Sequence, residues 1–301
     1  MTKPVSEQIG LAGALAAVTS WGANSVILKF LTGQMSVPLL NASRILIASA
    51  VFMLILAFLR RGKGFPKLEP RDWLSLILAG MIGTSVYQLL FANGIKLANA
   101  SITALISSTN PIWIGILGAF LGQKLTRWQL IGVPVTMLGV ALLSYSSIVG
   151  ANVQPLGVLL LIASNICWSV YTVMSRGLMQ KINPLEFTCL SFALGGLPFV
   201  LFSLPAWSGA SAVPSDIWLW VGLSALLAQV LGFMGWFLGT QALGAARVSV
   251  FLNITPLVGV ALAASFLGER ITAEKIVAGV VILVGVWLAN RRDVASTQLG
   301  V

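Results

Sequence analysis

One stretch of the sequence occurs twice, and this duplication limits what the chain can fold into more than any other feature does. Residues 97–142 align without a gap on residues 243–288. Leu97 meets Leu243, Thr109 meets Thr255, and the Phe-Leu-Gly at 120–122 recurs at 266–268. Each copy holds two apolar runs joined by a short polar hinge. Since the period is about half of the chain, the pattern indicates an internal duplication and not a solenoid of short repeats.

The apolar content of the chain identifies its solvent. Of the 301 residues, 57% are hydrophobic and 9% are charged, whereas a soluble domain carries about 25% charged residues. The mean hydropathy is +0.95. A water-soluble fold of this length cannot bury so much apolar surface, so most of it must face lipid. The sequence therefore predicts a multi-pass membrane protein.

Apolar runs long enough to cross a membrane can be counted directly, because a spanning helix needs about 20 residues. Ten runs qualify, near residues 8–31, 37–59, 73–94, 98–122, 128–148, 156–179, 184–206, 217–242, 246–267 and 273–289. The connections between them are short, and no extramembrane domain is left over. We expect an all-α membrane protein of ten transmembrane helices, arranged as two five-helix repeats at residues 1–150 and 151–301.

Basic residues give the expected orientation, since Lys and Arg collect in cytoplasmic loops. The loop after the second run contains five of them: Arg60, Arg61, Lys63, Lys67 and Arg71. Its counterpart after the seventh run contains none and carries Asp216. Opposite charge bias in equivalent loops, with five runs per copy, predicts that the two repeats cross the membrane in opposite directions. Both termini are then cytoplasmic, and the net charge of +10 reflects this bias and not nucleic-acid binding.

The repeats resemble a known family. Each begins with a Trp-containing run and ends in a Gly-rich pair, and residues 266–272 read Phe-Leu-Gly-Glu-Arg-Ile-Thr. These features resemble the EamA-type members of the drug/metabolite transporter superfamily, over essentially the whole chain and most closely the bacterial YddG-type exporters of aromatic amino acids. In the first repeat Gly122-Gln123-Lys124 replaces Gly-Glu-Arg, so we interpret Glu269 as structural and not as a coupling carboxylate.

The resemblance implies a function and a location. It implies a transporter in the bacterial inner membrane that exports small amphipathic metabolites, aromatic or apolar amino acids, by alternating access around a central cavity. Inverted repeats give this mechanism a physical basis, because two similar halves can exchange conformations around a site at the midplane. Exporters of other metabolites or of aromatic drug-like cations are the alternative.

A proline interrupts the first run of each repeated stretch, at Pro111 and Pro256. Inside a helix a proline leaves the carbonyl four residues earlier without its usual partner, here that of Ser107 or Leu252. Lipid cannot satisfy a bare carbonyl, so such breaks persist where they face protein or a wet cavity. We expect both breaks to line the cavity and to act in gating. A packing kink satisfied by Ser and Thr side chains is the alternative.

Aromatic and amide side chains recur together inside the runs. Trp21 and Asn24 lie three positions apart and share a helix face, as Trp168 and Tyr171 do. Tryptophans also form belts at membrane surfaces, but Trp21 and Trp168 lie deeper in their runs. Aromatic faces beside a few amides suit an amphipathic substrate. The expected substrate-binding residues are Trp21, Asn24, Tyr87, Phe91, Ser108, Trp168, Tyr171, Gln229, Trp236 and Asn253.

Ionisable groups inside the runs are few. Arg44 is the deepest, and the chain contains no histidine. Asp and Glu are absent from the middle of every run, so a carboxylate proton relay has no candidate. We expect export driven by the gradient of the solute itself, or coupled weakly.

Several chemistries are excluded. The chain has no G-x-x-x-x-G-K-[ST] loop for a nucleotide, and without histidine it has neither an H-E-x-x-H motif nor a Ser-His pair. Cys167 and Cys189 lie inside apolar runs and predict neither a disulfide framework nor a zinc site. We therefore expect no enzyme, cofactor or metal, with an intramembrane lipid-modifying enzyme or a passive channel as alternatives.

Small-residue pairs concern the oligomeric state. Gly118 and Gly122, and likewise Gly235 and Gly239, have the spacing that lets helices approach closely. We expect them to pack within the bundle of a monomer, whose partners are the small-molecule substrate and the lipid bilayer. Dimerisation through these pairs is the alternative.

Overall fold

A computed structural model of the chain describes residues 5–61, 64–98, 100–120, 122, 125–148, 154–267 and 272–291. All regular secondary structure in these ranges is helical. The first half holds α1 (Glu7–Leu31), α2 (Val37–Leu59), α3 (Pro70–Gly80), the π-helical η1 (Met81–Val86), α4 (Tyr87–Leu97), α5 (Ala100–Ser107), α6 (Asn110–Phe120) and α7 (Arg127–Ile148). The second half holds α8 (Pro155–Leu178), α9 (Pro184–Phe202), the 3₁₀-helical η2 (Leu204–Ala212), α10 (Ser215–Ser224), the π-helical η3 (Ala225–Leu231), α11 (Gly232–Leu243), α12 (Ala245–Ser249), the 3₁₀-helical η4 (Val250–Ile254), α13 (Thr255–Leu267) and α14 (Ala273–Ala289).

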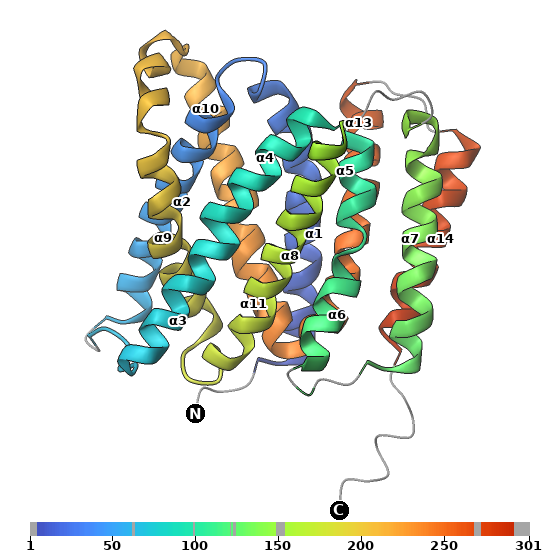
Figure 1. Cartoon of the computed structure of the whole chain (residues 1–301), viewed down its shortest axis with the longest axis horizontal. Helices are drawn as coiled ribbons and strands as arrows, with labels where there is room; N and C mark the ends of the chain where they lie inside the picture. The colour runs from blue at the N-terminus through green and yellow to red at the C-terminus, as the bar shows by residue number, and fades with distance from the viewer. Residues whose placement is uncertain are drawn as a thin grey trace, which may run out of the picture.

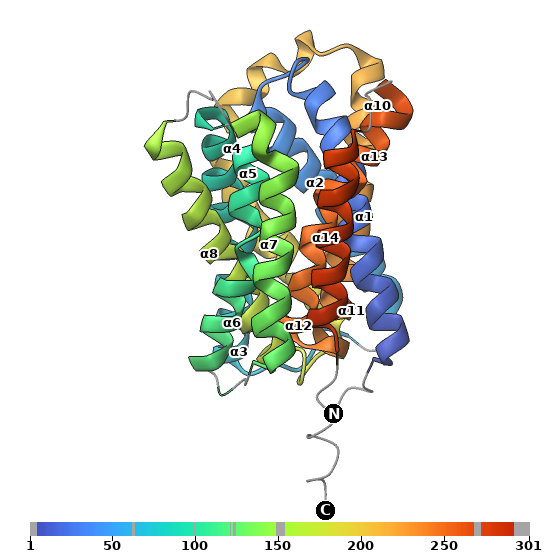
Figure 2. The ribbon, with the colours of Figure 1, turned by 90° about the vertical axis from the view of Figure 1, so that its right-hand side faces the viewer.

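The predicted runs correspond to these helices, singly or joined end to end. Within the described ranges, nine helical stretches are long and apolar enough to cross a membrane. The tenth, α14, has 17 residues and lies along α7, as Figure 2 shows. The prediction was wrong at the end of the seventh run, which was expected to reach residue 206. α9 ends at Phe202 instead, and η2 follows with Pro205 in its first turn.

The two halves run through the bundle in opposite directions. In Figure 1, α1 begins at the lower end of the bundle and α8 begins at the upper end. The end of α14 returns to the level at which α1 starts. This antiparallel arrangement is the one that an odd number of spans in each copy requires.

The helix contacts repeat when the two halves are interchanged. α1 packs against α11, and its counterpart α8 packs against α4. α2 packs against α9, and α7 packs against α14. α1 also contacts α13, as α8 contacts α6. Each half is therefore bound mainly to the other, so relative motion of the halves changes the contacts along the shared interface.

Glycines bring helices of different halves together. A Cβ atom on Gly80 of α3 would lie 2.0 Å from the Ser191 carbonyl oxygen of α9, and one on Gly235 of α11 would lie 2.4 Å from the Gly13 carbonyl oxygen of α1. Side chains larger than hydrogen would force these backbones apart. The prediction that Gly235 packs within the bundle is confirmed.

Candidate substrate-binding site

Three indole rings from three helices meet where the halves join. The ring centroids of Trp21 and Trp168 are 5.6 Å apart, as are those of Trp21 and Trp236, and Trp168 and Trp236 are 5.7 Å apart. The Trp21 and Trp168 rings are nearly perpendicular, at 83°, which is a favourable edge-to-face geometry. α1 supplies one ring, whereas α8 and α11 of the second half supply the others.

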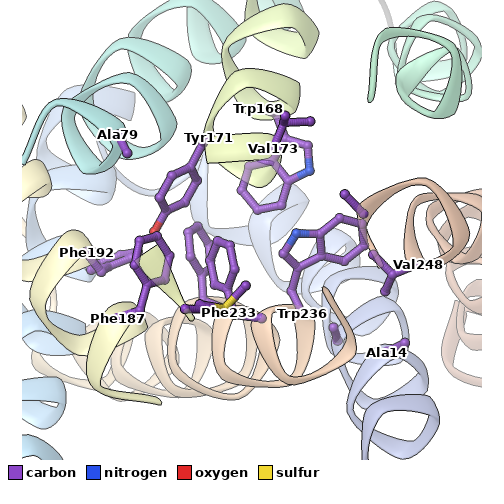
Figure 3. Close-up of a cluster of buried hydrophobic side chains, with 14 of the residues drawn as sticks. Ala14, Ala79, Trp168, Tyr171, Val173, Phe187, Phe192, Phe233, Trp236 and Val248 are labelled. Atoms are coloured by element: carbon purple, nitrogen blue, oxygen red, sulfur yellow. The ribbon is translucent and has the colours of Figure 1, made fainter. Parts of the chain in front are cut away.

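Further aromatic rings extend this cluster. Tyr87 of α4 lies 5.4 Å from Trp168 and stacks on Phe91, which is 5.3 Å away at an angle of 19°. Tyr171 packs against Trp168 at 6.0 Å. Ring contacts thus join six of the predicted residues, which come from four helices, and Figure 3 shows the rings of Trp168 and Trp236 next to each other. We refer to these six rings as the aromatic cluster: Trp21, Tyr87, Phe91, Trp168, Tyr171 and Trp236.

Phe233 is the residue that the predicted set lacked. Its ring contacts Trp21 at 6.2 Å, Trp168 at 5.4 Å and Phe192 at 4.8 Å, and Figure 3 places it between Tyr171 and Trp236. Its position four residues after Gln229 was the available signal, since that spacing places both on one helix face.

Polar partners hold the rings in place. The Trp236 indole donates to Thr172 Oγ1 at 3.2 Å, and the Tyr171 hydroxyl pairs with Ser191 Oγ at 2.7 Å. Asn24, one turn beyond Trp21, accepts a hydrogen bond from Ser224 Oγ at 2.6 Å. Each partner belongs to a helix that borders the cluster, so the rings are fixed by hydrogen bonds as well as by packing.

Two π-helical segments border the cluster at equivalent places, η1 before Tyr87 and η3 before Phe233. π-helical turns are rare and are frequent at functional sites. Each is tied to the opposite half: the Trp21 indole donates to the Ala228 carbonyl of η3 at 2.7 Å. Ser85 of η1 donates to the Gly195 carbonyl of α9 and accepts from the Phe199 N–H.

Gln229 lies within η3 and is 1% exposed. Both polar atoms of its amide are buried and have no hydrogen-bond partner. Leaving such a group unsatisfied costs about 1–3 kcal/mol. This amide is therefore a candidate for binding a polar group of a solute.

The helix breaks occur at both predicted prolines. α5 ends at Ser107 and α6 starts at Asn110, so Pro111 lies in the first turn of α6. Pro256 lies in the first turn of α13, directly after η4. In both copies the α-helix is interrupted just before the proline, at equivalent positions of the two repeats.

The prediction of a free carbonyl was wrong in the second copy. There the Leu252 carbonyl accepts the N–H of Thr255, because the chain forms the 3₁₀ turn η4 before Pro256. The spacing of an ideal helix does not include such a turn. In the first copy, the neighbouring carbonyl of Ile106 accepts a hydrogen bond from Asn165 Nδ2 of α8 at 2.6 Å, and the free carbonyl of Ser107 stays a prediction.

Two predicted residues are engaged elsewhere. Ser108 is buried and its hydroxyl donates to the Leu105 carbonyl at 2.6 Å. Asn253 donates to Thr136 Oγ1 of α7 at 2.6 Å, and its amide oxygen is buried without a partner. The role of both residues in binding a solute stays a prediction.

Ion pairs join the two halves at one end of the bundle. Arg60 pairs with Glu186 at 2.8 Å, Lys181 with Asp72 at 2.7 Å, and Arg247 with Glu7 at 2.8 Å. In every pair one partner belongs to each half. All of these residues lie near the ends of helices, at the lower end in Figure 1 where α1 starts. The predicted structural residue Glu269 lies outside the described residues.

The described residues contain no group of three His, Cys, Asp or Glu side chains able to hold a metal ion. The apolar helical bundle defines a multi-pass membrane protein. The chain belongs to the EamA-like transporter family, whose model matches it twice, over residues 8–145 and 155–291.

Individual relatives match most of the length of the chain. The transporter YyaM of Bacillus subtilis is 28% identical over 277 residues, covering 89% of each protein. A Salmonella typhimurium protein named "Probable amino-acid metabolite efflux pump" is 27% identical, covering 91% of this chain and 92% of its own. A Streptantibioticus cattleyicolor protein named "Probable terminal-alkyne amino-acid exporter" is 27% identical and covers 86% of each.

A solved structure supports the fold. One crystal structure matches this protein with a TM-score of 0.77 at 22% sequence identity, covering 98% of this chain and 100% of its own. At this identity the likeness establishes the helical fold alone.

Proposed function

We propose that the protein exports small amphipathic metabolites, namely aromatic or apolar amino acids, by alternating access. The aromatic cluster between the halves 1–150 and 151–301 is exposed in turn to one side of the membrane and then to the other. The observation that carries this proposal is the meeting of Trp21 from one half with Trp168 and Trp236 from the other. A site built from both halves changes its accessibility whenever the halves rock against each other. We propose transport and no enzymatic reaction.

The chemistry of the cluster favours an amphipathic solute. Indole and phenol rings provide flat apolar faces, and amides and hydroxyls beside them orient a polar end. Gln229 offers a buried amide with no partner, and Asn24 lies one turn from Trp21. The names of two relatives, an amino-acid exporter and an amino-acid metabolite efflux pump, support the amino-acid class.

The driving force in this proposal is the gradient of the solute. Within the described helices, Asp and Glu lie near the ends: Glu7, Asp72, Glu186, Asp216 and Glu274. A proton relay through the membrane requires acidic groups at intermediate depth. Transport in this proposal therefore needs no fixed number of protons.

The proposed location is the bacterial inner membrane with both termini in the cytoplasm. The loop between α2 and α3, rich in basic residues, supports this orientation. The ion pairs Arg60–Glu186, Asp72–Lys181 and Glu7–Arg247 then close the cytoplasmic end. Opening toward the cytoplasm to load a solute separates these charges.

Counterflow in proteoliposomes tests the proposal. Purified protein is reconstituted with unlabelled phenylalanine or leucine inside, and entry of the labelled amino acid is followed. The expected result is saturable uptake that internal solute accelerates, because a carrier returns faster when loaded. Linear uptake without this acceleration would indicate a channel. Proton movement at a fixed ratio to solute would contradict the gradient-driven mechanism, and lipid consumption without flux would indicate an enzyme.

A further inference from the structure

Arg44 carries a buried charge that pairs with no acidic side chain of the described residues. It lies in α2 and is 4% exposed. Its side chain donates one hydrogen bond, from Nη1 to the neutral Oδ1 of Asn41 at 3.0 Å, and its Nε atom is buried with no partner. The guanidinium presents five N–H donors, so most of its binding capacity is unused.

Such an arrangement calls for an explanation. An unpaired charge within a membrane-spanning helix is costly, and ionisable residues there pair with each other or mark a solute pathway. Within the described residues, three acidic side chains pair with other bases at the end of the bundle, and three are exposed near helix starts. The first group is Glu7, Asp72 and Glu186; the second is Glu69, Asp216 and Glu274.

Arg44 lies within electrostatic range of the aromatic cluster. Its charge acts on Tyr87, and Tyr87 in turn contacts Trp168 and Phe91. The neighbouring element η1 adds Thr84, whose hydroxyl is also buried and has no partner.

Close packing holds these groups at one place. A Cβ atom on Gly196 of α9 would lie 2.6 Å from Ile45 Cγ2 and 3.5 Å from Thr84 Cγ2. The residue after Arg44 and the residue Thr84 therefore approach the same point on α9. Helices α2 and α9 and the segment η1 converge there, so Thr84 lies near the residue that follows Arg44 in α2.

We propose that Arg44 binds the carboxylate of the transported solute while the rings of Tyr87 and Trp168 hold its apolar part. This inference rests on the proposed function and narrows its substrate class to carboxylate-bearing solutes. A carboxylate matches the planar guanidinium fork with two parallel hydrogen bonds and supplies the missing negative charge. Thr84 can donate a further hydrogen bond to the same group. Aromatic cations, esters and amides would lack this interaction.

The test compares two solutes that differ only at the carboxylate, which is replaced by an amide in one of them. Counterflow of phenylalanine and of phenylalaninamide is measured with the wild-type protein, Arg44→Gln and Arg44→Lys. Arg127→Gln, which removes an exposed arginine, is the matched control. We expect the wild type and Arg127→Gln to prefer the carboxylate at least about tenfold, and Arg44→Gln to lose this preference, because a charge-assisted pair is lost. Arg44→Lys should keep part of it, since it retains the charge but not the fork.

Thermal stability in detergent separates this role from a structural one. Arg44→Gln removes an unpaired buried charge, so without solute it should melt at the same temperature as the wild type or higher. Phenylalanine should raise the melting temperature of the wild type and not that of Arg44→Gln. An unchanged preference in Arg44→Gln, or an equal loss of both fluxes, overturns the inference. If that variant does not fold, an unchanged preference in Arg44→Lys overturns it.

The two proposals fail in different ways. A wild-type protein that exchanges neither solute contradicts the proposed function. A wild-type protein that exchanges phenylalanine and its amide equally well retains the proposed function, and only the role of Arg44 is then wrong.

Discussion

Trp168 has more ring contacts than any other residue of the aromatic cluster. It contacts Trp21, Tyr87, Tyr171 and Trp236 within the cluster, as well as Phe233. It is 5% exposed. This ring contacts side chains from both halves. We therefore expect substitutions of Trp168 to change both solute binding and the contact between the halves.

We expect Trp168→Ala or Tyr87→Ala to reduce counterflow at least about tenfold, since each removes a ring from the site. Trp168→Phe should retain part of the flux. Truncating a buried tryptophan costs about 3–5 kcal/mol of stability, so size-exclusion profiles of each variant must accompany the flux. Trp287→Ala, which removes a ring that is 58% exposed and lies outside the aromatic cluster, is the control and should transport normally. Normal flux in both Trp168→Ala and Tyr87→Ala would remove the site from this cluster.

Gln229→Met tests whether the buried amide serves the solute. The substitution keeps the approximate volume and removes two unsatisfied polar atoms. We expect the melting temperature of the solute-free protein to rise, because about 1–3 kcal/mol of desolvation penalty disappears. The half-saturation concentration for counterflow should increase. A stabilised protein with unchanged half-saturation would show that the amide plays no part in binding.

The sequence predicts residues of this site only where local spacing is informative. Trp21 with Asn24, and Trp168 with Tyr171, share helix faces and were found by that rule. Whether a face turns toward the other half depends on tertiary packing. Asn253 illustrates this, since it has the right composition and depth but bonds to Thr136 of α7.

At the scale of helices, close glycine contacts fix how the halves meet. Gly80 of α3 and Gly195 of α9 face each other so closely that a Cβ atom on Gly195 would lie 2.1 Å from the Gly80 carbonyl carbon. This contact involves backbone atoms, which cannot move aside as a flexible side chain can.

We expect Gly80→Ala to destabilise the protein by about 1–3 kcal/mol, because the added methyl group overpacks the α3–α9 contact. Gly222→Ala in α10 is the matched control, since a Cβ atom there meets nothing within 4 Å. The control should be neutral or slightly stabilising. Thermal unfolding in detergent measures both, and equal melting temperatures would contradict the packing described.

Helix positions follow from the sequence better than helix irregularities do. Apolar length located the helices except at the end of the seventh run, and the two prolines located the breaks. The π-helical segments were not predictable. The Trp21 indole donates a hydrogen bond to the Ala228 carbonyl of η3, and these two residues are 207 positions apart in the sequence. No local residue pattern encodes such a partner.

At the scale of the whole molecule, the three ion pairs between the halves lie at the end where α1 starts. Basic loop composition predicted the location of Arg60, but the identity of its partner Glu186 in the other half required the structure. The pair is largely buried, with side chains 19% and 14% exposed. It is therefore screened less by salt than a pair on an open surface.

Exchanging these charges tests whether the pair controls opening. Glu186→Arg places two arginines together, so we expect the closed end to open more readily and counterflow to fall. The double variant Arg60→Glu with Glu186→Arg restores an attractive pair and should recover flux. No recovery in a folded double variant would show that the pair acts otherwise. Glu274→Arg, which changes the net charge by the same amount at an exposed site, is the control.

Alternating opening of the two ends is the central claim, and distances between spin labels test it most directly. One pair of cysteines replaces Phe65 and Gln180, which lie near the ion pairs. A second pair replaces Gln34, between α1 and α2, and Ser211, in η2, at the other end of the bundle. The background carries Cys167→Ala and Cys189→Ala, and pulsed electron paramagnetic resonance is recorded with and without saturating phenylalanine.

The account predicts two distance populations at each end, with the solute lengthening one end as it shortens the other. Conditions that populate the wide form at the Phe65–Gln180 end should populate the narrow form at the Gln34–Ser211 end. A single unchanging distance at both ends of a transport-competent protein, or widening of both ends together, would contradict it.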